Sequence, residues 1–221
     1  LLLITRGDII MNQVLQADVV IIGGSMGGCA AALAAAKTGK SVIMTEETAW
    51  IGGQLTSQGV PPDEHPWIEQ FGATRTYRQF RNGVRDYYRR HFPLTAEARD
   101  KEHLNPGNGN VSRLCHEPRT ALAVIQEMLA PYVHSGRIKI FTNYVPVNVE
   151  VDGDEVLSVQ VKDQANGSLL TLTSDFFLDA TECGDLLPLA NVEYVTGSES
   201  QAQTKEPHAL VGEADPLDMQ S

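Results

Sequence analysis

The chain has 221 residues, of which 42% are hydrophobic and 20% charged, so it is long enough to bury the core of one large or two small domains. Its formal net charge of −11 argues against a nucleic-acid or anionic-membrane partner, and no apolar run approaches the roughly 20 residues of a membrane span. Three widely spaced cysteines, Cys29, Cys115 and Cys183, form neither a disulfide framework nor a zinc-binding spacing, so we expect a reducing, cytoplasmic location and no bound metal.

The first predicted strand covers residues 18–22 and leads into a glycine-rich turn and an alanine-rich helix over residues 29–37. The turn consists of Gly23, Gly24, Ser25, Met26, Gly27 and Gly28. Because glycines have no Cβ, the N–H groups and the positive end of the helix dipole can approach a pyrophosphate closely. Ser25 replaces the middle glycine of the G-x-G-x-x-G fingerprint, but its small hydroxyl can donate to a phosphate. This order predicts the start of a dinucleotide-binding domain.

A second apolar strand is predicted over residues 41–45, after Gly39 ends the helix. Glu46 follows Gly28 by 18 residues, close to the ~20-residue interval of the acid that binds ribose hydroxyls. Glu47, the next residue, is also predicted to belong to the cofactor-binding site. The two strands and the helix between them therefore predict a βαβ unit that carries its own ribose-binding acid.

Residues 60–115 are predicted to form a helical insertion. A helix over residues 71–92 carries a stripe of arginines at helical spacing, which we interpret as a solvated face that pairs with acidic groups rather than as an anion site. The stripe consists of Arg78, Arg81, Arg85 and Arg89. A polar loop around residues 105–110 precedes a second helix over residues 117–133, with Pro118 in its first turn.

The last part of the chain alternates apolar and polar residues. A short strand is predicted over residues 138–141, and three further strands over 145–151, 155–161 and 169–173 are separated by Asp-Gly and Asn-Gly turn signals. A strand over residues 175–180 then returns to the first sheet. The sequence predicts an α/β, Rossmann-like fold with a parallel sheet, a helical insertion and a three-stranded antiparallel β-meander.

The predicted elements also suggest the domain boundaries. Met11 sits just before the first strand, so we interpret residues 1–15 as an N-terminal extension. Residues 16–195 form the predicted cofactor-binding domain. Residues 196–221 are polar and acidic, and we expect them to be the start of a further region that is cut short.

Four further segments follow one another in a distinctive order: W-I-G-G-Q-L-T at 50–56, E-P-R at 117–119, D-A-T-E-C-G-D at 179–185 and T-G-S-E-S at 196–200. With the glycine turn and the meander, they make the chain resemble the FAD-dependent oxidoreductases that have a glutathione-reductase-type FAD-binding domain. The resemblance covers roughly residues 16–220. It departs from the family pattern at Ser25 and at Glu182-Cys183, where the second flavin motif often has Gly-Asp. Family members are longer, so the chain resembles an N-terminal part.

The resemblance implies FAD as cofactor and a role for each segment. The turn over 23–28 would cradle the pyrophosphate, and Glu46 with Glu47 would hold the adenosine ribose. A backbone group near Val147 would meet the adenine, and Asp185, preceded by Ala180 and Thr181, would face the ribityl chain or pyrophosphate. Four residues would run from the pyrophosphate toward the flavin ring: Gly52, Gly53, Gln54 and Leu55.

FAD would accept hydride from an unidentified small-molecule substrate. No acid or base is assigned: His65, Cys115 and His116 are candidates by residue type only, and each is more simply a loop or packing residue. Cys29 is expected to pack in the first helix as a small hydrophobe.

Two alternatives stay open. One is an NAD(P)-binding Rossmann domain, because the glycine fingerprint serves both cofactors, although the segments at 52–54 and 179–185 favour FAD. The other is a non-catalytic fragment. Several segments contribute to cofactor affinity, and one end of the cofactor site is expected to be missing from this chain.

Overall fold

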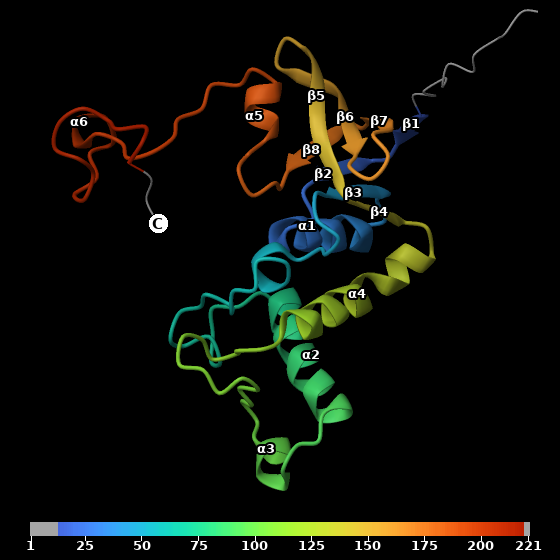
Figure 1. Cartoon of the computed structure of the whole chain (residues 1–221), viewed down its shortest axis with the longest axis vertical. Coiled ribbons are helices and arrows are strands. Elements are labelled where there is room, and N and C mark those ends of the chain that lie inside the picture. Colours follow the sequence, from blue (N-terminus) through green and yellow to red (C-terminus); the bar gives the residue numbers. More distant parts are fainter. Residues whose placement is uncertain (1–12, 219–221) are drawn as a thin grey trace, which may run out of the picture.

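The structure is a computed structural model that describes residues 13–218 (Figure 1). Residues 1–12, which make up most of the predicted N-terminal extension, lie outside the described residues, as do residues 219–221. The strands are β1 (Gln13–Gln16), β2 (Val19–Ile22), β3 (Val42–Glu46), β4 (Ile138–Thr142), β5 (Tyr144–Asp152), β6 (Glu155–Asp163), β7 (Leu169–Thr173) and β8 (Phe176–Asp179). The helices are α1 (Met26–Lys37), the 3-10 turn η1 (Gly53–Leu55), α2 (Arg75–His91), α3 (Ala96–Asp100), α4 (Pro118–His134), α5 (Leu186–Leu189) and α6 (Gln201–Thr204).

The centre of the molecule is a parallel sheet with the strand order β4-β3-β2-β8. Its apolar side chains point alternately to two separate cores, as the two-residue period of a strand requires. Ile21 and Met44 pack with α1, α2 and α4 on one face, whereas Val20, Ile22 and Ile43 pack with the meander on the other. Figure 1 shows α1 and the meander on opposite sides of this sheet. The predicted α/β, Rossmann-like fold is confirmed.

The meander β5-β6-β7 is antiparallel, as predicted, but the sheet that contains it has four strands. β1 adds to it by pairing in parallel with β7, from Gln13 opposite Leu170 to Gln16 opposite Thr173. Residues 13–15, which the sequence analysis assigns to an extension, therefore belong to a sheet. The physical reason is the open hydrogen-bonding edge of β7, which β1 occupies.

Helix α1 begins at Met26, three residues before the predicted start. Ser25 caps the helix, because its Oγ accepts the N–H of Gly28 at 3.2 Å, and this allows two glycines into the first turn. Cys29 is buried as a packing residue of this helix, as predicted. Burial, together with the nearby charge of Glu46, raises the pKa of the Cys29 thiol to about 12, so the group remains a protonated packing residue.

The helical insertion differs from its prediction in its boundaries. Helix α2 begins at Arg75 rather than Phe71, because the Oγ1 of Thr74 accepts the N–H of Tyr77 and caps the helix there. A short helix that was not predicted, α3, lies between α2 and the predicted polar loop. Helix α4 spans nearly the predicted residues and has Pro118 at its first position.

The prediction of a solvated arginine stripe on α2 is wrong for its two central members. Arg81 and Arg85 are 0% and 3% exposed. The loop before α2 folds back over the helix and brings Glu64 and Glu69 into ion pairs with them. These two arginines do pair with carboxylates, as predicted, but the ion pairs are buried. They are buried because the loop before α2 covers this face of the helix.

The chain leaves the sheets after α5. It forms a small lobe around α6, set apart from the rest of the molecule in Figure 1, with isolated bridges between Ser198 and Asp215 and between Ser200 and Leu210. Within residues 13–218, no helix is both long and apolar enough to cross a lipid bilayer.

Candidate dinucleotide site

The candidate site lies at the carboxyl edge of the parallel sheet, where β2 ends at Ile22. Gly23 follows with φ +100°, and a Cβ on it would lie 2.2 Å from the carbonyl oxygen of Ala180, the residue after β8. A Cβ on Gly28 would lie 2.1 Å from the carbonyl oxygen of Gly23. These two glycines are therefore required by the close packing of turn, helix and β8.

The second glycine segment lies directly beside this turn. Gly52 donates its N–H to the carbonyl oxygen of Gly24 at 2.7 Å, and a Cβ on Gly53 would lie 3.2 Å from the Cα of Ser25. Both Gly52 and Gly53 have positive φ angles, +108° and +49°, which glycine adopts without strain. Two segments that are about 25 residues apart in the sequence thus meet at one helix end, as a shared pyrophosphate requires.

The end of α1 at this point can bind an anion. Ser25 satisfies the N–H of Gly28, but the N–H groups of Met26 and Gly27 are first-turn donors that an α-helix does not use internally. A Cβ on Gly27 would meet only the Oγ of Ser25, at 3.6 Å. The positive end of the helix dipole lies at the same place. The residues present therefore fit a phosphate group.

Glu46 is held firmly at the end of β3. It is 6% exposed; its Oε2 accepts the N–H of Gly24 at 3.0 Å, and its Oε1 accepts the N–H and the hydroxyl of Thr48 at 2.8 and 2.7 Å. A carboxylate oxygen has two lone pairs, so Oε2 retains one for a further donor. Glu46 thus fixes the glycine turn and can still accept a ribose hydroxyl.

A narrow cleft runs from the glycine turn to the meander. It is lined by Ile22, Gly23, Thr45, Glu46, Glu47, Tyr144, Pro146, Ala180, Thr181, Glu182 and Asp185. Of the predicted residues, the lining contains Gly23, Glu46, Glu47, Ala180, Thr181 and Asp185. Val147 is not among them: it lies at a register shift of β5 between Pro146 and Asn148. Its neighbours Tyr144 and Pro146 on the same strand line the cleft. Their two-residue spacing marks them as one face of a strand, but a register shift cannot be read from the sequence.

The turn over residues 179–185 is rigidly built. Asp179 accepts the N–H and hydroxyl of Thr181 through Oδ1 and the N–H of Leu186 through Oδ2, while the Oγ1 of Thr181 accepts the N–H of Asp185 at 2.8 Å. These bonds hold the carboxylate of Asp179 inside the turn, and Asp185 lines the cleft. This places the predicted second flavin motif opposite the glycine turn.

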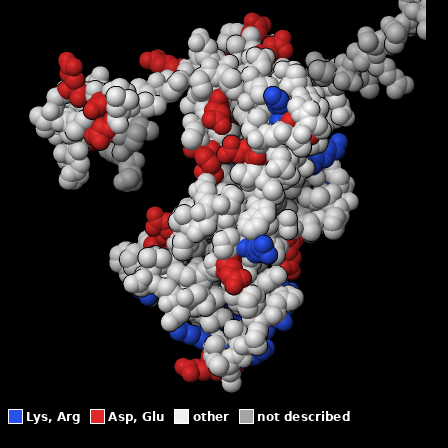
Figure 2. Space-filling model, in the orientation of Figure 1, with Lys and Arg blue, Asp and Glu red and all other residues white. Residues whose placement is uncertain are grey.

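The cleft is strongly acidic, with four carboxylates in its lining. Besides Glu46, Glu182 also lies against the glycine segments: its Oε1 is 2.6 Å from the position that a Cβ on Gly53 would take. Figure 2 shows acidic side chains gathered at this level of the molecule, whereas basic side chains lie mainly on the lobe of α2 and α3. Carboxylates can accept hydrogen bonds from ribose hydroxyls. The negative charge of Glu182, however, would repel a pyrophosphate bound at the glycine segments.

Two members of the predicted segment at 52–55 turn away from the cleft. Leu55 is 2% exposed and belongs to the core beneath α1, and the amide of Gln54 lies 3.5 Å from the carbonyl oxygen of Pro61. Leu55 instead forms part of the wall of a second cavity, between α1, α2 and α4. The segment therefore connects the cleft to the helical lobe.

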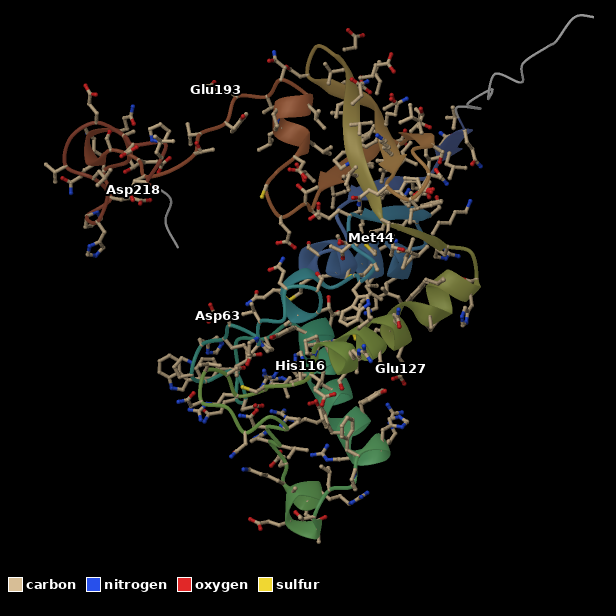
Figure 3. The ribbon with its side chains drawn as sticks, in the orientation of Figure 1. Met44, Asp63, His116, Glu127, Glu193 and Asp218 are labelled. Atoms are coloured by element: carbon tan, nitrogen blue, oxygen red, sulfur yellow. The ribbon has the colours of Figure 1, made fainter. Side chains whose placement is uncertain are left out.

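The three candidate acid–base residues lie in the helical lobe and do not line the cleft. The Nδ1 of His65 lies 3.2 Å from the N–H of Trp67, and the ring stacks on Phe71. Cys115 is buried and donates its N–H to Asn105. Burial lowers the pKa of His116, which lies just before α4 (Figure 3). The part of the chain from 13 to 218 contains no cluster of three or more acidic, histidine or cysteine residues that could hold a metal ion.

Fold and site together define an α/β protein built to hold a dinucleotide. Over residues 18–220 the chain matches the family of FAD dependent oxidoreductases. It belongs to that family, and FAD is its cofactor. Membership of this family favours FAD over NAD(P), the two cofactors with which the glycine fingerprint is compatible.

The chain is also similar to several solved structures at low sequence identity. L-proline dehydrogenase from P. horikoshii is 17% identical with a TM-score of 0.38, over 76% of this chain and 23% of that one. Mycobacterium smegmatis Sdh1 in complex with UQ1 is 17% identical with a TM-score of 0.43, over 76% and 34%. The flavin-dependent monooxygenase PieE, in complex with FAD and substrate, is 15% identical with a TM-score of 0.49, over 84% and 34%. The chain thus spans 23% to 34% of these three proteins. No curated protein matches the sequence.

Proposed function

We propose that this chain is the FAD-binding portion of an oxidoreductase in which a small-molecule substrate gives hydride to the flavin. The observation that carries the proposal is the meeting of two glycine segments at the N-terminus of α1, bridged by the 2.7 Å hydrogen bond from Gly52 to Gly24. FAD, when bound, supplies the two-electron acceptor for the oxidation. The chain's own contribution is to bind and orient the cofactor.

Most of the predicted residues then have a role that their positions support, Gln54 and Leu55 excepted. The turn over 23–28 donates N–H groups to the pyrophosphate, and Glu46, with Glu47 beside it, accepts the hydroxyls of the adenosine ribose. Gly52 and Gly53 approach the pyrophosphate from the other side. Ala180, Thr181 and Asp185 close the cleft opposite the turn. The adenine lies against the strand that contains Tyr144, Pro146 and Val147.

The domain plan is part of the proposal. The FAD-binding unit extends over residues 16–195 together with the edge strand β1, and residues 60–115 are an insertion that carries α2 and α3. Residues 196–221 begin a further region. The meander and the parallel sheet share one core, with buried residues from both, which supports treating them as one unit.

Ser25 provides the test of cofactor binding, because it stands at the centre of the glycine turn. Ser25→Gly restores the fingerprint and costs only a few tenths of a kcal/mol at an N-cap. We expect this variant to bind FAD at least as well as the original protein. Ser25→Val removes the capping oxygen and adds a branched side chain facing the phosphates, so we expect FAD to bind at least about tenfold more weakly. Flavin retained after gel filtration, measured by its yellow absorbance, gives the comparison.

Circular dichroism checks that both variants are folded. Equal flavin content in the two variants would remove the glycine turn from the site. A colourless protein that takes up no added FAD would favour the non-catalytic alternative instead. For any compound that bleaches the bound flavin without oxygen, deuterium on the oxidised carbon should slow the bleaching, and an unchanged rate would exclude hydride transfer from that carbon.

A further inference from the structure

The helical lobe contains most of the buried polar atoms that have no hydrogen-bonding partner among residues 13–218. Four side-chain atoms in this described part of the chain are of that kind, and one of them lies on Thr45 in β3. The other three are Oε2 of Glu64, Nε of Arg81 and Nε2 of His116. Because an unpaired buried polar atom costs free energy, such atoms are rare in native proteins. Three of them in one lobe point to a shared ligand.

The three residues are neighbours, although they come from three segments. Glu64, in the loop before α2, is 3% exposed and forms an ion pair with Arg81, which is 0% exposed. His116, just before α4, packs edge-on against Phe80, the residue before Arg81, with ring centroids 6.1 Å apart (Figure 3). Burial lowers the pKa of His116, and the charge of Glu64 is close enough to oppose this. The unpaired atoms therefore belong to one polar cluster between the loop, α2 and α4.

The neighbours of these atoms define their hydrogen-bonding roles. Oε1 of Glu64 accepts the hydroxyl of Tyr77 at 2.5 Å and an N–H of Arg81, so Oε2 is the unpaired acceptor. Nδ1 of His116 lies 3.2 Å from the carbonyl oxygen of Glu117; it therefore carries the proton, and Nε2 is an acceptor. Nε of Arg81 is a donor. The cluster thus offers two acceptors and one donor.

The charge of the cluster selects a neutral ligand. Arg81 and Arg85 balance Glu64 and Glu69. The lowered pKa of His116 favours its uncharged form. An additional ion would be buried here without a counter-charge, which is costly. An ammonium ion has no lone pair for the donor, and a halide ion has no hydrogen for the two acceptors.

We propose that this cluster is the binding site of a single internal water molecule. The water accepts the Nε–H of Arg81 and donates its two hydrogens to Oε2 of Glu64 and Nε2 of His116. Buried water molecules typically make about three hydrogen bonds of this kind. The water joins the loop over residues 60–74 to the start of α4. It also completes a hydrogen-bonded chain from Tyr77 through Glu64 to His116.

A high-resolution crystal structure of the protein tests the site directly. We expect one water position within about 2.7–3.2 Å of all three atoms. A structure with no water within reach of both Glu64 and His116 would overturn the assignment. The cluster contains none of the residues that line the dinucleotide cleft, so the result does not depend on FAD.

Magnetic resonance tests the same site in solution. The Hε proton of Arg81 should show a nuclear Overhauser contact with a water molecule that exchanges slowly. Arg90 on the same helix is the control, because its side chain is 51% exposed and meets only rapidly exchanging water. Indistinguishable water contacts at the two arginines would refute a bound water.

A pair of substitutions at His116 tests its role as an acceptor. The side-chain oxygen of His116→Gln can still accept from the water, whereas His116→Leu removes the acceptor at similar size. We expect only His116→Leu to weaken the water contact of Arg81 and to raise the unfolding equilibrium constant by about fivefold relative to His116→Gln.

His134 provides the matched control, because it is exposed at the end of α4. His134→Gln and His134→Leu should differ in this constant by no more than about twofold. Equal water contacts in His116→Gln and His116→Leu would exclude His116 as a partner of the water and overturn the proposed site.

Discussion

At the scale of single residues, the acidic lining of the cleft opposes part of its cofactor. Glu46 is fixed by three hydrogen bonds and is proposed to accept the ribose hydroxyls. Glu182 makes no such set of contacts and is exposed beside Gly53 and Ser25. A pyrophosphate placed on the helix end meets this carboxylate. The side chain is flexible, so it can move aside, but its charge remains close.

We therefore predict that Glu182→Gln strengthens FAD binding. An exposed charge at this distance changes affinity modestly, by about two- to fivefold. The gain should shrink as salt is raised, because exposed charges are screened within about 10 Å at 0.1 M ionic strength. Titration of the apoprotein with FAD at low and high salt measures both effects. Weaker binding in Glu182→Gln would mean that this carboxylate holds the cofactor rather than opposing it.

At the scale of elements, the loop over residues 60–74 is joined to α2 by buried charges. Arg81 pairs with both Glu64 and Glu69, and Arg85 pairs with Glu69 and donates from Nε to the carbonyl oxygen of Leu104 at 2.9 Å. These four side chains join the loop to the helix through ion pairs rather than through apolar packing. Such a network favours one position of the loop on the helix, but removal of one member leaves its partner buried without a compensating charge.

We predict that Arg81→Leu destabilises the protein by roughly 3–5 kcal/mol, because it leaves Glu64 buried without a compensating charge. Arg90→Leu is the matched control on the same helix: its ion pair with Glu127 is exposed, so a change below about 1 kcal/mol is expected. Urea unfolding measures both. The double variant Arg81→Leu with Glu64→Leu should recover part of the loss. No recovery would show that the packing of the arginine stem, not its charge, stabilises the lobe.

At the scale of the whole molecule, the sequence predicted the parts that repeat a local pattern. The βαβ unit, the glycine turn and the meander follow from apolar periodicity and turn residues, and Glu46 follows from its spacing. The sequence could not predict features set by contacts between distant segments. Gly52 meets Gly24 across 28 positions, a register shift in β5 puts Pro146 rather than Val147 in the cleft lining, and Arg81 is buried because the preceding loop folds back over it. β1 was missed because an edge strand of four residues has almost no pattern of its own.

Two titratable groups that pack near α2, His116 and Glu69, make the stability of the protein depend on pH. Burial lowers the pKa of His116 from its ordinary 6.5, although the carboxylate of Glu64 and a hydrogen bond to the carbonyl of Glu117 oppose this. Burial alone would raise the pKa of Glu69, but Arg85, Arg81 and His103 outweigh it and lower the pKa from 4.5. Both groups bind protons more readily in the unfolded chain, so acid favours unfolding.

We therefore predict that the free energy of unfolding falls in two stages as the pH is lowered. The first loss begins below pH 6.5, as His116 in the unfolded chain becomes protonated, with a slope of at most about 1.4 kcal/mol per pH unit. The second begins below pH 4.5, through Glu69. His116→Gln should abolish the first stage and keep the second. Urea unfolding at a series of pH values measures this, and parallel profiles for the two proteins between pH 6.5 and 4.5 would rule out His116 as the group responsible.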